Sequence, residues 1–131
     1  MEAMAGDEVI DDRDRVEITV PLDSRYISAV RVLCASLAAD AGFSVDEIDD
    51  LRLAVSEAFS LLAERQPGGR LTTSFHTRGD RLDIELIGDV AGVDLRPDDL
   101  ARKILDAVVD NYRFDLRSVV MTKRASEVFS A

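Results

Sequence analysis

The chain has few of the residues on which redox and metal chemistry depend. Among its 131 residues there are one cysteine, one histidine and no tryptophan. A lone Cys34 excludes an internal disulfide and a cysteine-rich metal site, and a lone His76 argues against a histidine-based zinc site or triad. We expect Cys34 to be a core residue and His76, on the polar side of an alternating strand, to be a solvated residue.

Long apolar runs and basic residues are also scarce. No run approaches the ~20 apolar residues that span a bilayer, and the acidic segment 1–14 has neither the basic nor the apolar region of a secretory signal. The net charge of −10 disfavours nucleic acid as a partner but suits a protein with basic patches. We therefore expect a cytoplasmic protein without a membrane or nucleic-acid partner.

The length and the composition predict one globular domain. We place this domain at residues 15–125, between a disordered acidic tail at 1–14 and a C-terminal tail at 126–131.

Residues 44–65 carry the longest helical pattern of the chain. Ser44 and Glu47 have the spacing of a capping box, and apolar residues then recur at steps of three and four. The run Gln66-Pro67-Gly68-Gly69 ends the helix. Glu57 interrupts an otherwise apolar flank, so its carboxylate either lies at the rim of a cleft or reaches to water.

Strands and two further helices surround this central helix. One helix is expected from Asp23 or Ser24 to Ala41, and another is expected to begin at Pro97. Alternation of apolar and polar residues predicts strands near 15–20, 71–77, 82–87, 112–116 and 118–124. The pattern predicts an α+β two-layer sandwich: a mostly antiparallel five-stranded sheet with three helices on one face.

The central helix also carries a family motif. Its sequence DDLRLAVSEAFSLLAER resembles a helix of the anti-sigma regulatory factors, which are serine-protein kinases of the histidine kinase/Hsp90-like (GHKL) ATPase fold. That helix reads roughly D-L-x-L-A-V-x-E-A, and LARKILDAVVDNYRF and SVVMTKRA resemble the late helix and closing strand of the family. The resemblance covers about residues 15–125 and implies the histidine kinase-like ATPase fold. The matching residues are Asp50, Leu51, Leu53, Ala54, Val55, Glu57 and Ala58.

The nucleotide motifs of that family are degenerate here. Glu57 occupies the position of the candidate general base, but Leu61 replaces the asparagine that binds magnesium four residues later. Because leucine has no oxygen to offer Mg²⁺, we expect no metal at this position. Without a metal-bound phosphate, Glu57 is expected to be a vestigial base.

The second motif, an Asp-x-Gly-x-Gly run that holds adenine, falls on residues 88–92. Gly88 takes the place of its aspartate, Asp89 stands one place away, and Val90 replaces a glycine, while Gly92 matches. Asp89 and Gly92 are therefore candidate remnants of an adenine site, although Asp followed by Gly also signals an ordinary turn.

The glycine-rich phosphate segment of the family is missing. Asp98 and Asp99 stand instead at the start of the next helix, and their carboxylates would repel a triphosphate.

The resemblance implies a regulator of transcription that sequesters a sigma factor. The lost motifs favour binding without kinase activity and without a cofactor. The resemblance also implies an anti-anti-sigma antagonist and a homodimer. One alternative is a serine/threonine kinase that binds ATP and magnesium and phosphorylates that antagonist, and another is a pseudo-ATPase module in a different signalling complex.

Charged residues on the first two helices are candidate partner contacts. Arg25 and Arg31 lie off the apolar stripe of the first helix, while Asp46, Asp49 and Asp50 crowd the start of the second. Such a surplus of acidic residues speeds encounter with a basic client, although a charge cluster can also be a solvated surface.

Overall fold

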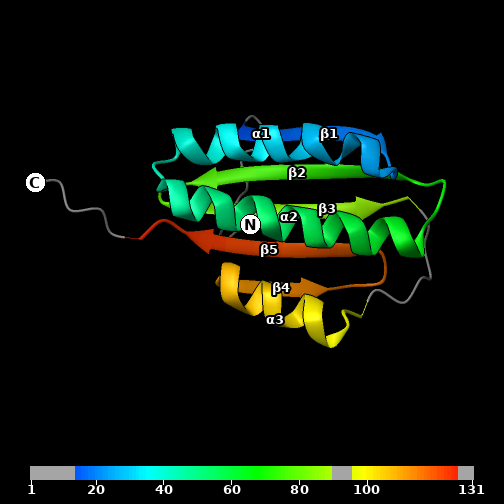
Figure 1. Cartoon of the computed structure of the whole chain (residues 1–131). Coiled ribbons are helices and arrows are strands. Elements are labelled where there is room, and N and C mark those ends of the chain that lie inside the picture. Colours follow the sequence, from blue (N-terminus) through cyan, green and yellow to red (C-terminus); the bar gives the residue numbers. More distant parts are fainter. Residues whose placement is uncertain (1–13, 90–95, 127–131) are drawn as a thin grey trace, which may run out of the picture.

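A computed structural model describes residues 14–89 and 96–126, and in this part of the chain one antiparallel sheet forms the base of the domain. The sheet has five strands in the order β1-β2-β3-β5-β4 (Figure 1). Every neighbouring pair is antiparallel. The strands are β1 (Arg15–Pro21), β2 (Arg70–Arg78), β3 (Arg81–Gly88), β4 (Asn111–Phe114) and β5 (Ser118–Arg124).

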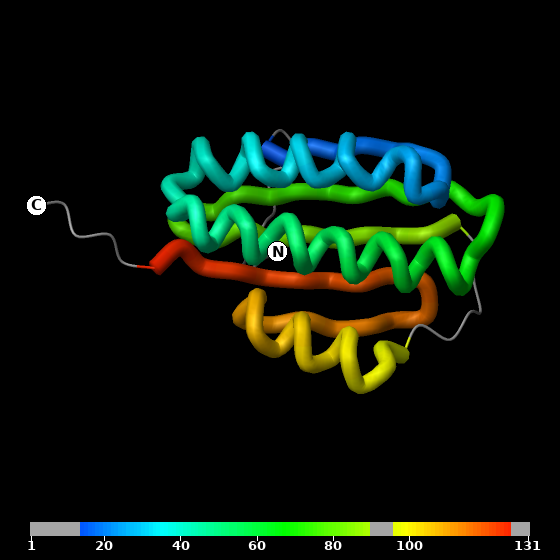
Figure 2. Tube along the Cα trace, in the orientation of Figure 1, coloured from blue at the N-terminus to red at the C-terminus, as the bar shows by residue number. Residues whose placement is uncertain are grey.

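Three helices cover one face of this sheet and leave the other face open. They are α1 (Ile27–Asp40), α2 (Val45–Arg65) and α3 (Asp99–Val108). Figure 2 shows α1 running beside α2 across the sheet, with α3 over the β4 edge. The expected α+β sandwich and the order of its elements are therefore confirmed.

The capping box at the start of α2 is present. The Ser44 hydroxyl accepts a hydrogen bond from the Glu47 amide (3.1 Å), and the Glu47 carboxylate accepts one from the Ser44 amide (2.8 Å). These two bonds satisfy amides that the first helical turn leaves without partners. The apolar side of α2 then packs against the sheet, with seven buried residues: Leu51, Ala54, Val55, Ala58, Phe59, Leu61 and Leu62.

The other two helices begin later than the sequence predicts. Asp23 caps a short 3-10 turn, Ser24–Tyr26, and α1 follows only at Ile27. Asp98, rather than Pro97, organises the start of α3, because its carboxylate accepts a hydrogen bond from the Ala101 amide (2.8 Å). An N-cap residue has extended backbone, as Asp98 does (ψ 177°), so Pro97 lies just outside the helix.

The hydrophobic core lies between the sheet and the helices. Cys34 is completely buried in it, and burial raises the pKa of its thiol to about 12. The thiolate, which is the reactive form, is therefore scarce at neutral pH. The expectation that Cys34 is a core residue is confirmed.

Glu47 also fastens the end of the described chain to the start of α2. Its second carboxylate oxygen accepts a hydrogen bond from the Ser126 amide (2.7 Å). Burial acts to raise the pKa of Glu47, but hydrogen bonds from the Ser44 and Ser126 amides outweigh it and lower this pKa to about 2. The ionised carboxylate is thus the form that the fold favours.

This carboxylate makes the stability of the domain depend on pH. Because its pKa is lower in the folded state, its contribution is complete above about pH 4.5 and is lost as the pH falls toward 2. We expect Glu47→Gln to be less stable than the wild type at pH 7, with a difference that shrinks on acidification. Urea unfolding between pH 7 and pH 3 measures this difference. Asp46→Asn, which removes a charge from the same helical turn, is the control, and a difference independent of pH would contradict the prediction.

Candidate functional site

The residues at the family's general-base and metal positions lie on one side of α2, a single turn apart. Glu57 is half-buried there, whereas Leu61 is only 8% exposed. The side chain at the magnesium-ligand position is therefore apolar and packed into the protein. Leu61 offers no ligand to Mg²⁺, a hard cation that requires oxygen.

The position of the missing adenine aspartate is closed by another side chain. Gly88 ends β3, and a Cβ built on it would lie 2.0 Å from Oε1 of Gln66. Gln66, the residue that follows α2, is 1% exposed. Its buried amide thus fills the space in which a larger residue at position 88 would extend. The sequence identified Gln66 only as part of a helix stop, and no local pattern indicates this packing.

Asp89 forms two hydrogen bonds with the backbone of Arg70, where β2 begins and β3 ends. Its carboxylate accepts a hydrogen bond from the Arg70 amide (2.9 Å), and its own amide donates to the Arg70 carbonyl (3.1 Å). These bonds extend the pairing of β2 and β3 by one residue and engage one of the oxygens that would read an adenine. Val90 and Gly92, the other residues of the motif, lie outside the described residues.

Two of the predicted partner residues lie in one groove between α1 and α2. Arg31 and Asp49 line a cavity of about 440 Å³ together with Arg52, Leu53 and Ser56. Asp49 pairs with Arg52 (3.4 Å). The Nε of Arg31 is buried and has no hydrogen-bond partner in the described part of the chain.

The other three predicted residues do not line this groove. Arg25 forms an ion pair with Asp23 (3.2 Å) and lies over the ring of Tyr26. Asp46 is exposed in the first turn of α2. Asp50 instead faces the Nζ of Lys123 on β5 (3.8 Å), so this carboxylate has an intramolecular partner.

Lys123 is a buried cation that the sequence did not single out. Its side chain is 11% exposed, and its Nζ donates a hydrogen bond to the carbonyl of Val108 (2.7 Å) at the end of α3. A cation there also suits the negative end of the helix dipole. Lys123 therefore links α2, α3 and β5.

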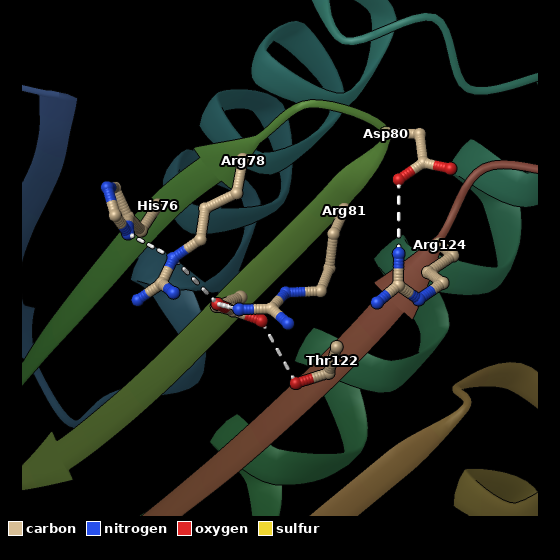
Figure 3. Close-up of polar contacts among 7 residues, drawn as sticks. His76, Arg78, Asp80, Arg81, Thr122 and Arg124 are labelled. Atoms are coloured by element: carbon tan, nitrogen blue, oxygen red, sulfur yellow. Dashed lines mark hydrogen bonds and ion pairs between the residues drawn. The ribbon is translucent and has the colours of Figure 1, made fainter. Parts of the chain in front are cut away.

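The prediction of a solvated His76 is wrong. His76 lies on the open face of the sheet but is only 8% exposed, and its Nδ1 accepts a hydrogen bond from Nε of Arg78 (3.1 Å). Arg78 of the same strand and polar side chains of β3 and β5 lie around it. Asp83 holds them in place, accepting hydrogen bonds from Arg81 (3.0 Å) and Thr122 (3.0 Å) and pairing with Arg78 (3.5 Å) (Figure 3).

Comparison with known proteins connects this structure to one group of bacterial kinases. No family model matches the chain. A serine-protein kinase RsbW from Halalkalibacterium halodurans is 33% identical over 73 residues, which are 54% of this chain and 45% of that protein. RsbW from Bacillus cereus is 29% identical over 94 residues, or 70% of this chain and 58% of the relative. The chain thus spans about half the length of these curated relatives.

A solved structure shares the fold. The crystal structure of the RsbU and RsbW domains of Rv1364c from Mycobacterium tuberculosis superposes with a TM-score of 0.64 at 18% identity, covering 85% of this chain and 32% of that one. Together with the sequence matches, it confirms the resemblance that the α2 motif indicated. In the described ranges, no helix is both long and apolar enough to cross a bilayer.

Proposed function

Because the chain shares sequence with the RsbW serine-protein kinases and its fold with a structure that contains an RsbW domain, we propose that it is an anti-sigma-like regulator. In this proposal it sequesters a sigma factor by protein–protein binding and does not phosphorylate a partner. An anti-anti-sigma antagonist would release the client. The homodimer that the resemblance implies and the cytoplasmic location expected from the sequence stay predictions.

The packing of Gln66 against Gly88 carries the proposal that nucleotide is not used. A buried amide stands where an aspartate would hold adenine, and the buried Leu61 stands where an asparagine would hold magnesium. Phosphoryl transfer depends mainly on positioning the phosphates and neutralising their charge. Without an aspartate to hold adenine and an asparagine to hold magnesium, the proposed protein would neither anchor the nucleotide nor neutralise its phosphates.

The groove between α1 and α2 supports binding of a protein partner. It combines a guanidinium whose Nε has no hydrogen-bond partner in the described residues, on Arg31, with the exposed side chain of Leu53 (43%). Exposed Val32 and Val45 (68% and 76%) lie on the same two helices. Interfaces commonly pair an apolar centre with arginine and a charged rim, so this surface is the docking site that we propose for the client.

The alternative function is a serine/threonine kinase with an altered metal site. It is favoured by Glu57, which keeps the position of the general base, and by the relatives, which are named serine-protein kinases. A kinase requires measurable affinity for Mg-ATP, whereas a binding module requires only a stable protein partner.

Titration with Mg-ATP separates the two functions. We expect isothermal calorimetry to detect no micromolar site, because the adenine and metal positions are occupied by Gln66 and Leu61. Leu61→Asn alone should not restore binding, since it leaves the adenine position closed. A bona fide RsbW kinase run in parallel is the positive control. Micromolar binding would overturn the proposal and favour the kinase, and transfer of labelled phosphate to an antagonist would establish it.

Charge reversal at the start of α2 tests the docking surface. We expect Asp46→Lys with Asp49→Lys to slow association with the sigma factor and to weaken its salt dependence, because the acidic surface attracts a basic client. Asp46→Lys also loses a dipole contact in the first turn of α2 of roughly 0.3–1 kcal/mol, too little to unfold the domain. Surface plasmon resonance at low and high salt measures the association rate.

A matched variant controls for the change in net charge. Glu64→Lys with Asp99→Lys adds the same charge at two exposed positions outside the groove, one of them also in a first helical turn. If both double variants slowed association equally, the effect would belong to overall charge and the groove would not be the docking surface.

A further inference from the structure

We draw no further inference here: the strongest candidate, the outer edge of β1 at one end of the five-stranded sheet, where Val16 is 36% exposed, carries none, because nothing in the described residues shows what covers it.

Discussion

Replacing Lys123 with alanine is expected to lower the free energy of unfolding by about 1.5–3 kcal/mol, the range for a hydrogen bond to a charged group. The substitution removes the donor for the Val108 carbonyl (2.7 Å) and the ion-pair partner of Asp50 (3.8 Å). It also removes an aliphatic stem that packs in the domain. Urea unfolding monitored by circular dichroism measures the change.

Two further lysine variants separate these contributions. Lys123→Met keeps most of the stem and loses the charge, so we expect it to recover only the packing part of the loss. Lys103→Ala, which truncates an exposed lysine on α3, should change stability by less than about 0.5 kcal/mol. If Lys123→Ala were as mild as Lys103→Ala, the link between α2, α3 and β5 would be unimportant for stability.

Gly88→Ala is expected to destabilise the domain by about 1–3 kcal/mol, the usual range for overpacking a filled interior. The added methyl group would stand 2.0 Å from Oε1 of Gln66, and this amide is too deeply buried to turn aside into solvent. The backbone of Gly88 is not the cause, because its φ is not among the positive values of the chain. Thermal unfolding and the urea midpoint both report the loss.

A double-mutant cycle identifies the clash as the cause. Gln66→Ala alone leaves a cavity and lowers stability, but in its background Gly88→Ala should cost much less than in the wild type. Such coupling is expected for residues in direct contact. Gly79→Ala is a poor control because Gly79 has a positive φ (59°). Ala101→Gly changes a buried residue elsewhere, and its loss of stability should simply add to that of Gly88→Ala. Strict additivity between positions 66 and 88 would contradict the packing described here.

The architecture was predictable because it depends on local patterns. The capping box of Ser44 and Glu47 and the periodic apolar side of α2 fix the central helix, and alternation fixes the strands. Boundaries were less accurate: the predicted strand 112–116 ends at Phe114 in the structure, and Leu116 is 75% exposed in the turn that follows.

The polar details could not be predicted because they depend on contacts between distant segments. Alternation assigned His76 to the correct face but could not show that an arginine two residues away would cover and bond it. Gln66 belongs to a helix stop in the sequence, yet it closes the space beside Gly88. Asp50 belongs to an acidic cluster, yet it faces a lysine on β5.

The pairing of the edge strand β1 with β2 closes a longer loop than the pairing of β3 with β5. Glu17 of β1 and Ser74 of β2 hydrogen bond across a separation of 57 residues, because α1 and α2 lie between the two strands in the chain. By contrast, short turns join β2 to β3 and β4 to β5. Closing a long loop costs more conformational entropy than closing a short one, and non-local pairing slows folding. Formation of α1 and α2 shortens the flexible segment that the β1–β2 pairing must close, and this couples one edge of the sheet to the helical layer above it.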